Sequence, residues 1–177
     1  MPGHSVLQLP VPALEVWVRA RTAHYDKGFV SSDPGFAHAH ITALGPFDPH
    51  PSEPAMRVVE AIATATAPMV VRLAELSQFP NGIIHLRPSP ADPLRALTAR
   101  LVAAFPDHPP YGGEFGIDVQ PHLTVDATSE HVSLDSTRQL LTGVVPVTCL
   151  LDRLQLAWWE SGNCHVVREW LLGDRTT

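Results

Sequence analysis

Two short segments of the sequence pair a histidine with a threonine in the same pattern, His40-Ile41-Thr42 and His122-Leu123-Thr124. On a β-strand, alternate residues point to one face, so each imidazole shares a face with its hydroxyl while the apolar residue between them faces the core. Two imidazoles that titrate near neutral pH can act as base and acid in the hydrolysis of a phosphodiester. The hydroxyls can donate hydrogen bonds to the non-bridging phosphate oxygens. This chemistry requires no metal, and neither segment carries an adjacent acidic cluster that would hold one.

A third imidazole, His38, precedes the first segment and opens two further interpretations. His38 and His40 could form half of a zinc site, but no third and fourth ligand is recognisable by spacing. Histidine-triad nucleotide hydrolases use three alternating histidines, whereas the third position here is Thr42. We therefore predict no metal site. His38 is a candidate for substrate contact at the rim of a cleft, although a solvated place at the start of the strand is favoured.

The segments that position these residues follow from periodicity and from turn signals. The pattern predicts a helix capped by Ser52 and a β-hairpin that turns at Asn81-Gly82. The expected strands are 5–11, 38–47, 70–80, 83–89, 117–127, 145–160 and 164–173, and the expected helices are 12–26, 52–67, 89–105 and 129–141.

The order helix, His-x-Thr strand, helix, hairpin occurs twice, at about 12–88 and about 90–172, with the strand 5–11 in front. We expect one domain over 1–177, built from these two lobes about a pseudo-twofold axis. That arrangement would bring the two His-x-Thr strands face to face across a cleft.

Several other residues are candidates for lining that cleft. His85 and His165 occupy matching places in the two hairpins, Tyr111 lies in a loop that could stack on a base, and Phe47 could close an apolar wall. Trp158 and Trp159 alternate, so at most one of them faces the cleft. Arg87 and Arg168 are the nearest cationic candidates for phosphate, but surface positions are favoured for both.

Composition restricts the class of protein. The chain has 177 residues, 45% of them hydrophobic and 17% charged, and a net charge of −6, which argues against an extended nucleic-acid-binding surface. Apolar runs are broken by charge, and no secretory signal is visible, so we expect no membrane span and a cytoplasmic location. Cys149 and Cys164 are expected to be buried, unpaired thiols. A monomer is expected.

"HAHITALGPF" and "PHLTVDA", together with the duplicated order, "PPYGGEFG" and the closing "WLLG", resemble the 2H phosphoesterases. That group includes 2′-5′ RNA ligase-like proteins, whose bacterial branch this chain is most similar to, and cyclic nucleotide phosphodiesterases. The resemblance implies a bilobal α+β fold, with two antiparallel sheets lining a central cleft and helices outside. It implies metal-independent, cofactor-free hydrolysis of a 2′,3′-cyclic phosphate or a 2′-5′-linked nucleotide or RNA end. The catalytic residues would be His40, Thr42, His122 and Thr124.

Three questions stay open at this level. The sequence does not assign acid and base between the histidines. The scaffold could act on another cyclic phosphate, such as a cyclic ADP-ribose phosphate or a cyclic oligonucleotide. The protein could also bind RNA ends without cleaving them, but two titrating groups are not needed for binding alone, which favours an enzyme.

Overall fold

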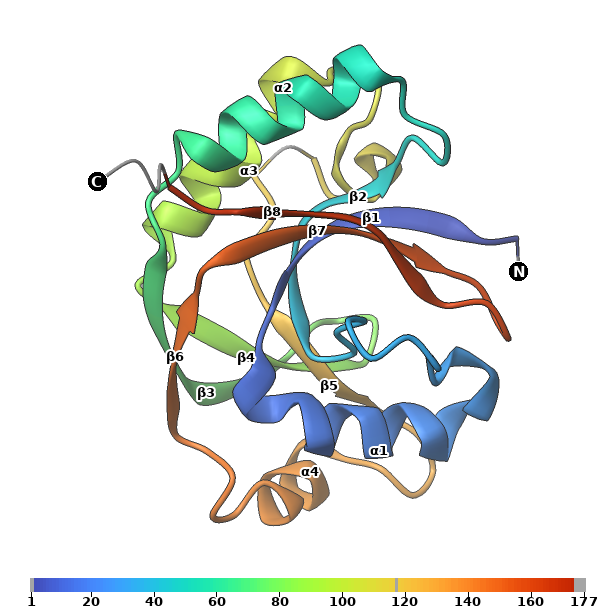
Figure 1. Cartoon of the computed structure of the whole chain (residues 1–177). Helices are drawn as coiled ribbons and strands as arrows, with labels where there is room; N and C mark the ends of the chain where they lie inside the picture. Colours follow the sequence, from blue (N-terminus) through green and yellow to red (C-terminus); the bar gives the residue numbers. More distant parts are fainter. Residues whose placement is uncertain (1, 117, 174–177) are drawn as a thin grey trace.

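The computed structural model describes residues 2–116 and 118–173, and its centre is formed by two four-stranded antiparallel sheets (Figure 1). In order across the first sheet, the strands are β2 (His40–Phe47), β1 (His4–Pro10), β7 (Arg153–Trp159) and β8 (His165–Leu171). In the second sheet they are β5 (Leu123–Ala127), β4 (Ile83–Ser89), β3 (Met69–Gln78) and β6 (Val147–Leu151).

The α-helices of the described residues lie outside the sheets (Figure 1). They are α1 (Glu15–Tyr25), α2 (Glu53–Thr64), α3 (Asp92–Ala104) and α4 (Leu134–Leu140). Short 3-10 turns flank α1 at η1 (Pro12–Leu14) and η2 (Lys27–Phe29), and a third, η3 (Pro110–Gly113), lies between α3 and β5. The expected α+β fold of two antiparallel sheets with outer helices is confirmed.

Local signals account for where several elements begin. The Ser52 hydroxyl accepts a hydrogen bond from the Ala55 amide (3.3 Å) and caps α2 as predicted. The expected strand 117–127 shortens to β5, because Pro121 has no amide hydrogen for a ladder; its residue 117 lies outside the described part. The expected helix 129–141 begins only at Leu134, where Ser133 and Ser136 form a capping box.

Each sheet contains strands from both halves of the chain, so the expected lobes 12–88 and 90–172 are wrong as spatial units. The hairpin β3–β4 belongs to the first half of the sequence but pairs with β5 and β6 in the second sheet. The segment 145–160, expected to be extended throughout, breaks at Asp152: β6 pairs with β3, and β7 crosses to pair with β1. The unit that repeats in space is strand, helix, His-x-Thr strand: β1-α1-β2 and β4-α3-β5.

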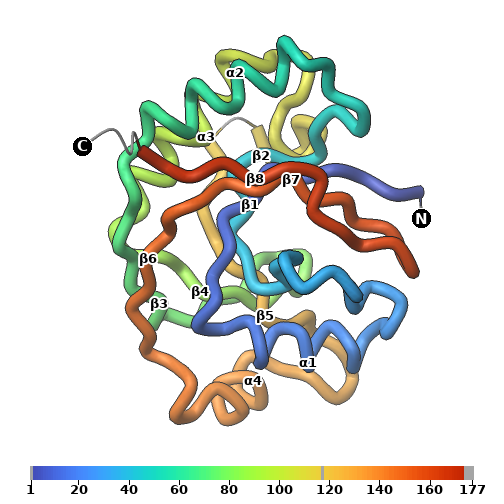
Figure 2. The backbone as a smooth tube through the Cα atoms, in the orientation of Figure 1, coloured from blue at the N-terminus to red at the C-terminus, as the bar shows by residue number. Residues whose placement is uncertain are grey.

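Both His-x-Thr segments lie at a sheet edge. β2 forms one edge of the first sheet and β5 one edge of the second, and the two strands contact each other without being hydrogen-bonded neighbours. The helices cross over between the units: α1, which connects β1 to β2, packs against β5, and α3, which connects β4 to β5, packs against β2. The tube trace in Figure 2 shows α1 passing beside β5, and each marked strand therefore rests on the helix of the other unit.

Cys149 and Cys164 are buried and free, as expected. Among the described helices, none has the length and apolarity needed to cross a membrane.

Candidate active site

His40 and His122 are held in the same way. Nδ1 of His40 lies 2.9 Å from the backbone oxygen of His38, and Nδ1 of His122 lies 2.9 Å from that of Gln120. A carbonyl oxygen only accepts, so Nδ1 carries the hydrogen in both rings. In the neutral imidazole, Nε2 then keeps its lone pair and is free to take a proton.

An aromatic ring packs against each of these imidazoles. The Trp159 ring lies 5.2 Å from that of His40, and the Phe79 ring lies 4.9 Å from that of His122 in an edge contact. Trp159 is oriented in turn by its indole N–H, which donates to the buried Gln8 side chain (3.0 Å). These contacts restrict the rotation of both imidazoles.

Burial makes both imidazoles weak bases in the free protein. It lowers the pKa of His40 to about 4, against the opposing effect of the His38 carbonyl, and the nearby charge of His122 lowers it further. Burial also lowers the pKa of His122, opposed by the Gln120 carbonyl.

Two adjoining cavities form the cleft, and Thr42 and Tyr111 line both. The smaller cavity, of about 300 Å³, is also lined by His40, and the larger, of about 610 Å³, is also lined by His122 and Thr124. The structure therefore brings all four predicted His-x-Thr residues to one cleft, with Thr42 and Tyr111 where its two parts meet.

Tyr111 occupies the place predicted for it. Its backbone is in the left-handed region (φ 51°), and Gly112 and Gly113 follow at positive φ, so the loop turns sharply over the cleft. Its ring lies parallel to that of His122 at 6.3 Å and makes an edge contact with Phe115. Burial raises the pKa of the Tyr111 phenol, and a hydrogen bond with Thr42 opposes the rise.

The favoured position of His38 is wrong: its side chain is neither solvated nor at the rim. His38 is 3% exposed, with Nδ1 2.6 Å from a carboxylate oxygen of Glu15 and Nε2 accepting from the Ser31 amide (3.0 Å). The sequence did not reveal this because Glu15 is 23 residues away. With both ring nitrogens occupied, His38 is a structural group behind His40.

Two further candidates lie away from the cleft. Phe47 is buried and packs against the rings of Phe105 and His108 (5.0 and 5.2 Å), so it belongs to the core and does not close the cleft wall. His165 lies on β8, the strand of the first sheet farthest from β2, and lines neither cavity.

His85 does not match His165, contrary to the expectation from the hairpins. It is buried on β4, opposite Thr124 of β5, and stacks on Phe79 at 3.8 Å with the His122 ring 5.3 Å away. Its counterpart in the first sheet is Gln8, opposite Thr42. Both residues support the aromatic ring beside a His-x-Thr histidine.

The favoured surface positions of the cationic candidates are confirmed. Arg87 pairs with Glu75 and Arg168 with Glu53, and these side chains are partly or largely exposed. Trp159 is the member of its tandem pair that lines the cleft, while Trp158 donates to Glu160.

Sequence reasoning missed several residues of the cleft and its support: Gln8, Glu15, Phe79, Phe115, Asp118 and Gln120. A signal existed for Gln8, a single amide within the otherwise apolar run "VLQLPV", since a buried amide must find hydrogen-bond partners. Among residues 2–116 and 118–173, no group of three or more His, Cys, Asp or Glu residues is arranged to hold a metal ion.

Known proteins share this architecture. LigT of E. coli, crystallised with 3′-AMP, has a TM-score of 0.57 at 16% identity, over 98% of this chain and 100% of LigT. TT0787 of Thermus thermophilus has a TM-score of 0.55 at 18% identity, over 97% and 100% of the respective chains. A structure described as a phosphoesterase has a TM-score of 0.54 at 16% identity, over 98% and 100%. At these identities the likeness establishes the fold.

No curated protein sequence matches the chain. The model of one protein family matches residues 9–163, a span that includes both His-x-Thr segments and most of the sequence. The chain is therefore a member of the 2′-5′ RNA ligase superfamily, and the predicted relation to the 2H phosphoesterases is confirmed.

Proposed function

We propose that the protein hydrolyses a 2′,3′-cyclic phosphate or a 2′-5′ phosphodiester of a small nucleotide, with His40 and His122 as the acid–base pair. One observation carries this proposal. Two imidazoles with free Nε2 atoms, each beside a threonine on the edge strand of a different sheet, line adjoining parts of one cleft.

In the proposed reaction, one imidazole is neutral and takes a proton from water. The water oxygen bonds to phosphorus, and the bond from phosphorus to a ribose oxygen breaks. The other imidazole, protonated, gives its proton to that leaving oxygen. Thr42 and Thr124 donate hydrogen bonds to the non-bridging oxygens, where negative charge is concentrated.

Substrate binding helps to supply the protonated imidazole. Both pKa values are lowered in the free protein, so both rings are mainly neutral at pH 7. A phosphodiester anion placed between the rings favours the charged form of one of them, which raises its pKa. The substrate thus promotes formation of the acid that it requires.

The larger cavity is suited to a nucleobase. Its lining includes the rings of Phe79, Tyr111 and Phe115, on which a base can stack, and the side-chain amides of Asn81 and Gln120. LigT has been crystallised with 3′-AMP, ATP and NADP+, which is consistent with nucleotide binding on this fold.

Charge in the cleft favours a substrate with a single phosphodiester. No Lys or Arg is among the described residues that line either cavity, and the carboxylate of Asp118 lines the larger one. The guanidinium of Arg87 approaches only through Gln120 (3.1 Å) and already pairs with Glu75. Additional phosphates would lack counter-charges, so cyclic mononucleotides and dinucleotides fit better than an ADP-ribose phosphate or an oligonucleotide.

The proposed mechanism operates without a metal or cofactor, because proton transfer and hydrogen bonding come from the chain itself. The expected cytoplasmic location and monomeric state stay predictions.

A substrate panel in EDTA tests the proposal. It should contain 2′,3′-cyclic mononucleotides, 2′-5′ and 3′-5′ dinucleotides, ADP-ribose 1″,2″-cyclic phosphate and a cyclic dinucleotide. We expect turnover of the cyclic mononucleotides or the 2′-5′ dinucleotides, with one regio-defined product and no loss on chelation. Tight binding of RNA ends without product would replace the enzyme by a binding module, and loss of turnover in EDTA would refute the metal-free mechanism.

A further inference from the structure

Helix α1 contacts β5 and the two residues that lead into β2, and it does so through one face. Glu15, Val18, Arg21 and Tyr25 recur every three or four residues and therefore lie along one side of the helix. Val18 is buried, Glu15 points to the start of β2, and Arg21 and Tyr25 reach the end of β5. A single helix thus connects β5 of the second sheet to the segment that leads into β2 of the first.

At β2, Glu15 fixes the backbone that holds His40. Its carboxylate accepts the Ala39 amide (2.8 Å) and lies 2.6 Å from Nδ1 of His38. The Ser31 amide donates to the other ring nitrogen of His38, so Nδ1 of His38 carries a hydrogen and donates it to Glu15. The backbone oxygen of the same His38 receives the His40 ring. Glu15 is therefore two contacts away from the His40 imidazole.

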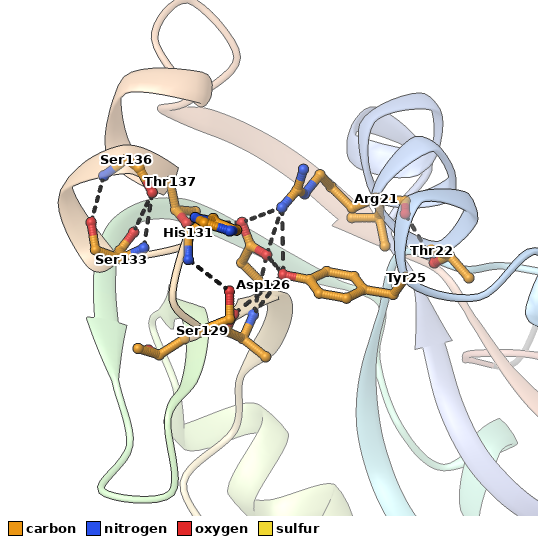
Figure 3. Close-up of polar contacts among 12 residues, drawn as sticks. Arg21, Thr22, Tyr25, Asp126, Ser129, His131, Ser133, Ser136 and Thr137 are labelled. Atoms are coloured by element: carbon orange, nitrogen blue, oxygen red, sulfur yellow. Dashed lines mark hydrogen bonds and ion pairs between the residues drawn. The ribbon is translucent and has the colours of Figure 1, made fainter.

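At β5, a buried carboxylate provides the second attachment (Figure 3). The side chain of Asp126 is 0% exposed, and both of its oxygens accept from one terminal nitrogen of Arg21 (2.8 and 2.9 Å). The Tyr25 hydroxyl also donates to Asp126, and Thr137 of α4 donates from the other side (2.9 Å). Asp126 follows Thr124 by two residues and lies on the same strand as the second His-x-Thr segment.

Both carboxylates remain charged despite their surroundings. Burial opposes ionisation of Asp126, but the hydrogen bonds from Arg21, Tyr25 and Thr137 outweigh it and lower its pKa. For Glu15, burial is likewise outweighed by His38 and the Ala39 amide, and its pKa is lowered. Ionised groups with several donors form short, directional hydrogen bonds, which makes both attachments stiff.

We infer that α1 is a brace that sets the separation of the two imidazoles, with Glu15 and the Arg21–Asp126 pair as positioning residues. This inference rests on the proposed function. β2 and β5 touch but share no ladder of backbone hydrogen bonds, so their relative position depends on the elements that bridge them. α3 is a second bridge: it packs against β2, and its Thr98 hydroxyl donates to the Ala43 backbone oxygen (2.9 Å).

The test neutralises each end of the brace in turn and separates catalysis from binding. Arg21→Gln and Glu15→Gln should each lower kcat by about 10- to 100-fold with KM nearly unchanged, because a displacement near 1 Å at the reacting groups can cost about 10²-fold. Arg138→Gln is the matched control, since it breaks the exposed Arg138–Asp135 pair on α4 and should leave kcat as in the wild type. Arg21→Lys, which keeps the charge, should recover part of the loss.

Thermal unfolding and circular dichroism of each variant identify a merely destabilised fold. If Arg21→Gln does not fold, Tyr25→Phe removes one hydrogen bond to Asp126 and should give a smaller, several-fold loss of kcat. Folded variants with unchanged kcat, or with a loss confined to KM, would overturn the brace.

A second readout does not depend on turnover. In Arg21→Gln, loosening of β5 should admit water to the cleft, so the pKa values of His40 and His122, measured by NMR, should rise toward their ordinary value of about 6.5. Unchanged titrations in a folded variant would count against the brace. A wild-type protein that turns over no substrate would instead refute the proposed function, while the NMR comparison would still test the geometry.

Discussion

The two sides of the cleft share their support but differ in their space. On each side, an imidazole donates Nδ1–H to the carbonyl two residues before it and has an aromatic ring about 5 Å away, Trp159 beside His40 and Phe79 beside His122. The His40 side lines a cavity of about 300 Å³, whereas the His122 side lines one of about 610 Å³. The repeated unit therefore accounts for the reactive groups, and the unrepeated loop that carries Tyr111 accounts for the difference in space.

Under the proposed function, this difference would distinguish the two ends of a substrate. A symmetric site would accept a phosphodiester in either direction, but a base fits better beside Phe79 and Phe115 than in the smaller cavity. The direction of binding then decides which imidazole faces the leaving oxygen. Acid and base roles would follow from cavity shape rather than from the imidazoles themselves.

Removing either imidazole should have the largest effect. His40→Ala and His122→Ala should each lower kcat/KM by about 10³-fold, within the range for general acid–base groups. His165→Ala is the matched control, because His165 makes the same hydrogen bond to the carbonyl two residues before it (2.9 Å) but lies outside both cavities. Kinetics on the best substrate of the panel provide the measurement. A loss on only one side of the cleft would break the equivalence of the two histidines.

Removal of either threonine hydroxyl should have the next largest effect on activity. Thr42→Val and Thr124→Val keep the shape and remove the donor, and each should lower kcat by about 10²-fold, as for the loss of one donor to a developing oxyanion. Thr148→Val, on the exposed face of β6, should behave as the wild type. Steady-state kinetics that show a change in KM alone would assign the hydroxyls to ground-state binding.

Loss of an aromatic ring from the larger cavity should have a more moderate effect. Phe115 is 55% exposed, and Phe115→Ala should raise KM for a cyclic mononucleotide about tenfold, since stacking on one base contributes about 1–3 kcal/mol. Ribose 2,3-cyclic phosphate, which has no base, should be hydrolysed equally well by both proteins. An equal rise of KM for both substrates would place the base elsewhere.

The dependence of kcat/KM on pH should show the smallest of these effects. The base must be neutral and the acid protonated, so kcat/KM should rise as pH climbs through about 4, the pKa of His40, and fall above the pKa of His122, which is lowered from 6.5. A bell-shaped profile with its optimum on the acid side of about pH 6.5 is expected. An optimum above about pH 7.5 would show that these imidazoles are not buried as described.

The sequence was sufficient to predict the four His-x-Thr residues that meet at the cleft, but not the order of the strands. Alternation along "HAHITAL" and "PHLTV" predicts which side chains share a face, and a repeat of the pattern predicts a second copy. The sheet to which a hairpin adds depends on long-range pairing, and no local pattern encodes that β3–β4 joins β5. The wrong prediction that His165 matches His85 and lines the cleft follows from this unpredicted strand order.

The burial of polar groups was the second feature that the sequence did not predict. His38 looked like a ligand because it lies two residues before His40, on the same face of the expected strand, but the partner that decides its role, Glu15, comes from α1. Asp126 likewise became important only through Arg21, 105 residues away. Such pairs depend on tertiary contacts that strand and helix periodicity do not record.

An activated leaving group tests the division of labour between the two histidines most directly. A nucleoside p-nitrophenyl phosphodiester releases p-nitrophenolate, which leaves without protonation, so loss of the acid no longer matters while loss of the base still does. Comparing kcat/KM of His40→Ala and His122→Ala on this substrate, we expect one variant to return to near wild-type activity and the other to stay about 10³-fold impaired. Equal impairment of both variants, or recovery of both, would contradict an acid–base pair.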